Sequence, residues 1–261
     1  MTLLVPNYLK ASNCQDSSVR YAWDDWKSLP ALESANNQLV ARLKRVSQRA
    51  DLAFACGTAE WMVYRFERLC DTSAPWNLIE SAWAMIVHLR YSVGAEAWSY
   101  HSQKGWEGPV KGPIKRGLEY LEAAFYLLSS EYRTDPLDLT VRLSTLTSYV
   151  MSDPMPYKTW CEQVLNRFEV LYPRDPEDPL GDVVPRQAVD PGFDFRVEQT
   201  EVLINEFLSS LDYRSNPFLR SPKAMLEHIE GEQDFKGIPY VFSIDADRTA
   251  RHTSRPHRHH D

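Results

Sequence analysis

The apolar residues of this chain are most concentrated between Asp51 and Arg90. This stretch divides into two runs, DLAFACGTAEWMVYRFERL and NLIESAWAMIVHLR, separated by turn residues that include Ser73 and Pro75. Both runs are long enough for helices and neither shows the strict alternation of a half-buried strand. Pro75 suits the first turn of the second helix. The pattern therefore predicts two helices that form a central antiparallel hairpin. Gly57, inside the first run, is expected to let another helix approach closely.

Helical spacing of apolar residues predicts further helices on both sides of this hairpin. Prolines separate most of them, as expected for residues that end or begin helices. Residues 1–14 are expected to be an extended lead-in, and residues 237–244 a short extended segment. The expected helices are 16–29, one from 32 to 48 that a break near 47–51 separates from the first helix of the hairpin, one from Pro113, and 137–152, 157–172, 197–211 and 222–230. The sequence thus predicts an all-α fold, a single multi-helix domain of about eight to nine helices over residues 1–245. A disordered His/Arg-rich tail is expected over residues 246–261.

One long proline-rich segment, residues 173–197, interrupts the helical pattern. From Pro173 to Glu201 there are eight acidic residues and three arginines. A loop of this length in a compact domain is usually functional or flexible. Its carboxylates would attract a basic partner, and its aromatic residues would anchor that partner. The candidate binding residues are Asp175, Glu177, Asp178, Asp182, Asp190, Phe193 and Asp194. The alternative is a solvated connector.

Composition narrows the possible functions. The 261 residues carry a formal net charge of −7, which disfavours a nucleic-acid partner because phosphate binding requires a basic surface. The N-terminus has no signal-peptide pattern, and no apolar run is long enough to cross a membrane. The four cysteines are scattered without a CxxC pair, so the simplest expectation is a reducing cytoplasm.

The most suggestive set of polar residues is Glu60, Glu80 and His88 within the predicted hairpin. Glu80 and His88 lie eight residues apart and share a helix face. A di-metal bundle would need Glu-x-x-His pairs on two helices, and neither these nor HExxH occurs. No GxSxG or GK[ST] pattern occurs either. We therefore expect no metal, no cofactor and no catalytic site, with Glu60 in an internal ion pair with Arg65 or Arg90.

Two stretches resemble a known class of proteins. The first consists of Ala53-Phe54-Ala55, Ala59-Glu60-Trp61 and Arg65-Phe66; the second consists of Asn216-Pro217-Phe218-Leu219, Ser221-Pro222, Met225 and Gly237-x-Pro239-Tyr240. Together they resemble helical immunity-type proteins that bacteria encode beside polymorphic or type VI secreted toxins. The resemblance implies a cytoplasmic antidote that binds its cognate toxin and blocks the active site. Such proteins share binding surfaces rather than a motif, so no residue role is transferred.

Three functions follow as hypotheses. The first is an immunity-type protein, a monomer or homodimer, that binds a basic cognate toxin through the acidic loop. The second is a helical enzyme or ligand-binding protein with a site near Glu60, Glu80 and His88. The third is a non-catalytic helical adaptor.

Overall fold

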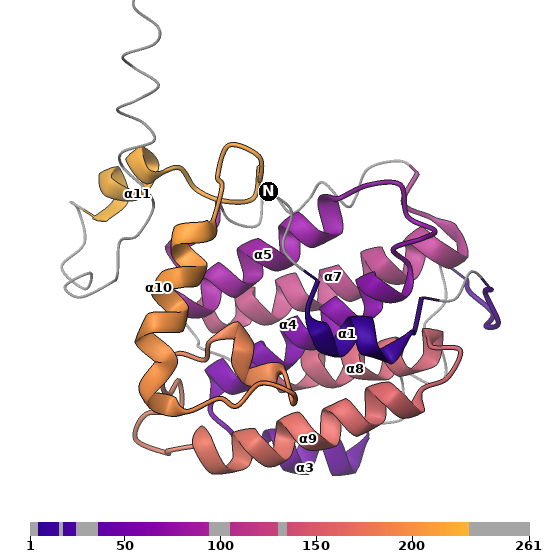
Figure 1. Cartoon of the computed structure of the whole chain (residues 1–261), viewed down its shortest axis with the longest axis horizontal. Helices are drawn as coiled ribbons and strands as arrows, with labels where there is room; N and C mark the ends of the chain where they lie inside the picture. Colours follow the sequence, from indigo (N-terminus) through magenta and orange to yellow (C-terminus); the bar gives the residue numbers. More distant parts are fainter. Residues whose placement is uncertain (1–4, 16–17, 25–35, 94–104, 130–134, 230–261) are drawn as a thin grey trace, which may run out of the picture.

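Helix α4 (Gln48–Arg65) lies at the centre of the molecule, and all but one of its residues are buried. Helices α5, α7, α8 and α9 all contact it (Figure 1). Its sequence has no continuous polar stripe, which is the pattern of a helix surrounded by protein. Ser47 caps its start, because the Ser47 hydroxyl accepts a hydrogen bond from the Ala50 backbone N–H. The apolar run that begins at Asp51 in the sequence is therefore the core helix of the fold.

The computed structural model describes residues 5–15, 18–24, 36–93, 105–129 and 135–229. Within these ranges it contains nine α-helices and no extended strand, which confirms the predicted all-α fold. The helices are α1 (Asn7–Ser12), α3 (Asn37–Leu43), α4 (Gln48–Arg65), α5 (Ala74–Val87), α7 (Gly108–Ser129), α8 (Leu137–Val150), α9 (Met155–Leu171), α10 (Thr200–Ser210) and α11 (Pro222–Ile229). Three short 3-10 helices, η1 (Leu89–Tyr91), η3 (Arg186–Val189) and η4 (Val197–Gln199), connect them.

Helices α4 and α5 form the predicted antiparallel hairpin. Trp83 of α5 contacts Glu60, whereas Val87 lies near Leu52, so the two helices run in opposite directions. Pro75 lies in the first turn of α5, as expected. The helix ends at Val87 rather than Arg90, because His88 adopts an extended conformation and its Nδ1 accepts the Arg90 backbone N–H.

Several helix boundaries differ from the predictions. Helix α7 begins at Gly108, so Pro113 lies inside it rather than in its first turn. Pro113 cannot donate to the carbonyl four residues earlier, that of Pro109, and the Tyr21 hydroxyl donates to this carbonyl instead. A tertiary contact thus satisfies the acceptor that a helix-interior proline leaves free.

The N-terminal predictions were wrong where the structure describes them. Residues 7–12 form α1 instead of an extended lead-in, with Leu9 fully buried. Residues 18–24, inside the predicted helix 16–29, are not helical, although Tyr21 and Trp23 pack against the core. The predicted extended segment 237–244 and the tail 246–261 lie outside the described residues.

The C-terminal helices cover the end of the hairpin. Leu208 of α10 and Met225 of α11 pack with Val87 and Tyr91 in a second, smaller apolar cluster. The Asn216-Pro217-Phe218 turn between these helices binds α5: Asn216 Nδ2 donates to the Asn77 carbonyl at 2.7 Å, and the Phe218 carbonyl accepts from the Ser81 hydroxyl. The Asn216-Pro217-Phe218 part of the second stretch therefore docks on the central hairpin.

Gly57 permits the close packing that its position predicted. A Cβ atom added there would lie 2.7 Å from Cζ2 of Trp160 on α9. Trp160 is itself buried and stacked on Phe54 and Tyr157, so the indole has little room to move.

We predict that Gly57→Ala destabilises the protein by about 1–3 kcal/mol, because the steric conflict exceeds the gain of about 1 kcal/mol in helix propensity. Urea unfolding followed by circular dichroism would measure the change. Gly192→Ala is the matched control, since its nearest neighbour is a side-chain oxygen at 3.3 Å. Stabilisation by Gly57→Ala would contradict the packing argument.

Candidate functional site

The first part of the acidic loop is fixed to the start of α4. The backbone N–H groups of Ser47, Gln48 and Arg49 donate to the carbonyls of Tyr172, Pro179 and Leu180, at 2.9–3.1 Å. Backbone N–H groups at a helix start have no acceptor within their own helix. The loop provides these acceptors, so its backbone is an ordered part of the domain.

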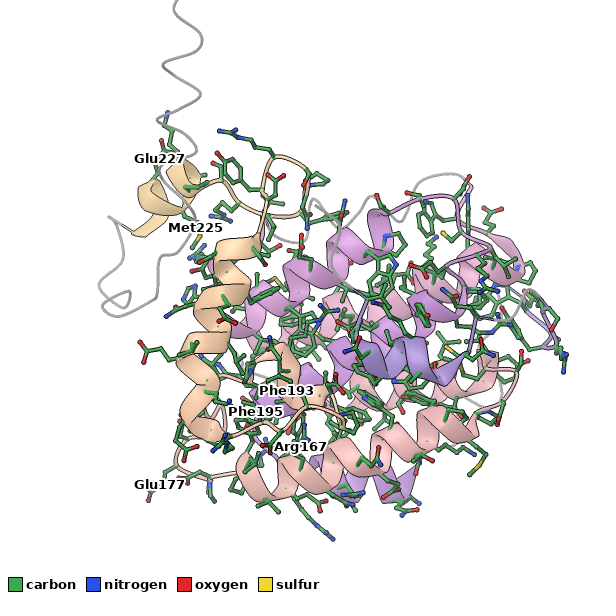
Figure 2. All side chains as sticks on the ribbon, viewed as in Figure 1. Arg167, Glu177, Phe193, Phe195, Met225 and Glu227 are labelled. Carbon is green, nitrogen blue, oxygen red and sulfur yellow. The ribbon has the colours of Figure 1, made fainter. Side chains whose placement is uncertain are left out.

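The second part of the loop is fixed to α9. Arg167 donates from Nη1 to the carbonyls of Ala188 and Asp190, and from Nη2 to that of Phe193, at 2.8–3.0 Å. Figure 2 shows Arg167 beside Phe193 and Phe195. Trp160 Nε1 also donates to the Val189 carbonyl at 2.8 Å. One guanidinium and one indole thus satisfy the carbonyls of a segment that has no regular hydrogen-bond ladder.

A buried carboxylate connects this loop to the core. Glu60 has no exposed surface, and three donors from distant parts of the chain reach it. Arg186 Nε and Trp83 Nε1 donate to Oε1 at 2.7 Å, and the Tyr8 hydroxyl donates to Oε2 at 2.6 Å. Burial, followed by the nearby Glu60 charge, raises the pKa of Tyr8 well above its usual value. The hydroxyl therefore remains a donor.

The cation beside Glu60 is Arg186, and the expectation of Arg65 or Arg90 was wrong. Arg65 donates from Nη2 to the Ser18 carbonyl and lies over the Phe66 ring. Arg186 is 126 residues from Glu60 in the sequence, in the loop that carried the predicted binding site. Helical spacing predicts ion pairs only between residues close together in the sequence, so it could not have predicted the pair of Glu60 with Arg186.

Glu80 and His88 do not join Glu60 in a shared site. Glu80 accepts from Asn216 Nδ2 at 2.8 Å, and burial raises the pKa of its carboxyl group. His88 uses Nδ1 as the acceptor that ends α5. Among the described residues, no group of three or more His, Cys, Asp or Glu side chains is arranged to hold a metal ion. Each of these three residues has a structural role.

The predicted binding residues of the loop differ in exposure. Asp175, Glu177, Asp178, Asp182 and Asp194 are exposed, whereas Asp190 and Phe193 are partly buried. Figure 2 shows Glu177 at the edge of the molecule, apart from Phe193 and Phe195. Phe193 packs against the core, and Phe195 is buried against Tyr172. The exposed carboxylates between residues 175 and 182 therefore form the part of the loop that a partner would reach first. We call the segment 175–182 the acidic ridge.

Two carboxylates of the acidic ridge also shape its backbone. Asp175 Oδ1 accepts the Glu177 N–H at 2.8 Å, and Asp178 Oδ1 accepts the Gly181 N–H at 3.3 Å. Asp side chains commonly stabilise turns in this way. Gly181 has a φ of +70°, and a Cβ there would lie 2.4 Å from Cβ of Ser47. Glu177 and Asp182 accept no such turn hydrogen bond, so they are the positions at which charge can be changed with least structural effect.

Asp51 is a buried carboxyl group that sequence reasoning did not single out. It is 2% exposed, and neither of its carboxylate oxygens has a hydrogen-bond partner within the described part of the chain. Burial raises the pKa of Asp51 from 3.8 to about 7, and the nearby Thr140 hydroxyl acts in the opposite direction. The Thr140 hydroxyl is close but makes no hydrogen bond of acceptable geometry. The only sequence signal was an acidic residue in the first turn of a very apolar helix.

No family model matches this chain, and neither the curated proteins nor the solved structures contain a significant match to it. None of the helices in the described ranges combines the length and hydropathy needed to cross a membrane.

We predict that Glu60→Gln destabilises the protein by about 3–5 kcal/mol, because it leaves the partly buried Arg186 guanidinium without a counter-charge. Glu162→Gln is the matched control: it also removes a carboxylate from an arginine pair, but Glu162 is exposed and Arg42 keeps its second partner, Glu169, so the loss is at most about 1 kcal/mol. Chemical denaturation would give both values. Hydrogen exchange at Arg186–Val189 should also become faster in Glu60→Gln only. If Glu60→Gln and Glu162→Gln both reduced stability by the same small amount, the Glu60–Arg186 pair would not be what holds the acidic loop in place.

We predict that Asp51 makes stability depend on pH. Since the pKa is higher in the folded than in the unfolded chain, the folded state binds the proton more tightly. Stability should therefore fall as pH rises from about 4 to about 7, by a few kcal/mol at most. Asp51→Asn should remove this decrease and be the more stable protein at pH 8. Urea unfolding at several pH values would test it.

Asp138→Asn is the control for Asp51→Asn, because Asp138 also occupies the first turn of a helix but is exposed. Its pH profile should match that of the unmodified protein. If Asp51→Asn also leaves the profile unchanged, the carboxyl group of Asp51 does not titrate in this range.

Proposed function

We propose that this protein is an immunity-type protein that neutralises a basic protein toxin by binding over the toxin's active site. The observation that supports the proposal most directly is the acidic ridge. It presents four exposed carboxylates, those of Asp175, Glu177, Asp178 and Asp182, on a backbone that is already fixed.

A fixed acidic surface suits an inhibitor of a basic protein for two reasons. Clustered carboxylates accelerate the encounter with an oppositely charged partner. A backbone held by α4, Arg167 and the Glu60–Arg186 pair does not have to become ordered on binding, which reduces the entropic cost of association. The family resemblance supplies the class of partner, a secreted toxin. The proposal includes a monomer or homodimer in the cytoplasm, where the four free cysteines would stay reduced.

The alternative of an enzyme or ligand-binding site at Glu60, Glu80 and His88 has no supporting geometry among the described residues. Glu60 and Glu80 accept hydrogen bonds from different segments of the chain, and His88 ends a helix. A non-catalytic adaptor would also use a binding surface, but nothing in the described structure favours it over the toxin-binding hypothesis.

The proposal is tested by co-expression. The product of the gene directly upstream would be expressed in a bacterial host with and without this chain. We expect growth arrest without it, rescue with it, and a 1:1 complex on size-exclusion chromatography. Absence of both rescue and complex formation with the neighbouring gene products would contradict the proposal.

We predict that Glu177→Lys/Asp182→Lys slows association with the toxin by about tenfold or more at low ionic strength, with the effect declining as salt is added. Stopped-flow or biolayer measurements would give the rate constants. Glu107→Lys/Glu206→Lys changes the net charge equally at exposed positions outside the loop and should have a much smaller effect. Equal association rates for the two variants would remove the acidic ridge from the interface.

A further inference from the structure

The acidic ridge forms one wall of a groove of about 430 Å³, within the range of about 300–1,000 Å³ that proteins use for ligands. Its opposite walls come from the start of α4, the end of α5 with η1, and the end of α7. The apolar lining includes Leu52, Met85, Val87, Leu89, Leu128 and Leu180. Glu177 and Asp178, both exposed, also line the groove.

One polar side chain in this groove makes no hydrogen bond within the described part of the chain. Gln48 lines the groove and is 6% exposed, and its amide has no hydrogen-bond partner in the described part of the chain, although its backbone N–H donates to Pro179. The amide atoms are not among the fully buried, unpaired polar atoms of the described residues, so they reach the open space of the groove. Its position in the lining makes it a group that a ligand would engage.

Two other charged or titratable residues line the groove. Arg49 donates from Nη1 to the Gly181 carbonyl at 2.7 Å and lies near Asp178 and Asp182. His88 uses Nδ1 to accept the Arg90 N–H. Arg49 therefore offsets part of the acidic charge, but Glu177 and Asp178 together exceed it. The groove combines apolar walls, acceptors at its rim and an unused amide.

We propose that this groove receives an arginine side chain of the protein partner. An arginine has an aliphatic stem that packs on apolar walls and a planar head with five donors. Glu177, Asp178 and Gln48 all line the groove, and the several donors of a guanidinium can serve more than one acceptor at once. Buried arginines are also frequent energetic anchors of interfaces. This inference rests on the proposed function, since it names the anchor that the toxin would supply.

The experiment uses the full chain and a small probe, so that it does not depend on finding the toxin. N-acetyl-arginine methylamide would be titrated into protein labelled at the methionine methyl groups, with Met85 as the reporter in the groove. The neutral control is N-acetyl-citrulline methylamide, which has nearly the same shape. We expect saturable shifts of the Met85 signal by the arginine probe, with millimolar affinity, and at least about fivefold weaker binding of citrulline.

Variants locate the binding. Glu177→Gln/Asp178→Asn removes both charges while leaving an oxygen that can accept the Gly181 N–H, and Gln48→Met removes the amide at similar volume. Each should weaken the arginine probe by at least about fivefold. Glu198→Gln/Glu206→Gln, with the same charge change elsewhere on the surface, should not. Absence of a saturable shift, equal binding of citrulline, or equal weakening by the control variant would overturn the proposal.

The outcomes separate this inference from the proposed function. If the co-expression experiment succeeds and the probe does not bind, the acidic ridge acts by charge alone and the groove inference fails. If the probe binds in the groove but no toxin is neutralised, the proposed function fails and the arginine site remains.

Discussion

The loss of water around the Glu60 carboxylate is the constraint on which the rest of the structure depends. A buried charge is tolerated only when donors replace its hydration. The three donors come from α1, α5 and η3, three segments that no regular hydrogen-bond ladder connects. Satisfying one carboxylate therefore fixes the N-terminal helix, the central hairpin and the acidic loop relative to one another. The same group holds the core together and positions the surface that we propose for binding.

This arrangement explains how residues 173–197, whose only regular structure is the short 3-10 helix η3 and the start of η4, can stay ordered. Backbone polar groups in such a segment need partners that a helix or sheet would otherwise provide. Here the start of α4 supplies backbone donors, Arg167 supplies its guanidinium, and Trp160 supplies an indole N–H. Each donor belongs to a helix that packs in the core, α4 or α9. The loop backbone is therefore held in place by the core, while its carboxylates remain exposed at the surface. A partner can bind these carboxylates without the loss of entropy that ordering a flexible loop would require.

The fold was largely predictable from the sequence, and the site was predictable only in part. The all-α class and most helices were predicted from local features of the sequence. These features are the apolar run that includes Phe54 and Trp61, and the prolines between helices. The predictions that failed concern features that depend on contacts between residues far apart in the sequence. Tyr21 satisfies the carbonyl that Pro113 frees, which lets α7 begin earlier than a proline rule allows. The exposed carboxylates could be named from composition alone. Arg186 as the partner of Glu60, Gln48 in the groove and the unpartnered Asp51 could not, because each follows from which segments meet in space.

Asp51 and Gln48 show how the start of one helix can carry both a structural cost and a binding opportunity. They lie three residues apart in the first turn of α4. The Asp51 carboxylate oxygens are buried without a partner in the described part of the chain, whereas the Gln48 amide atoms are not among such buried atoms. Asp51 faces Thr140 of α8 inside the core, where a ligand cannot reach it, and its burial is a cost that raises its pKa. Gln48 lines the groove beside the acidic ridge, where a partner can reach it. Access, rather than the missing hydrogen bond itself, decides which of the two serves recognition.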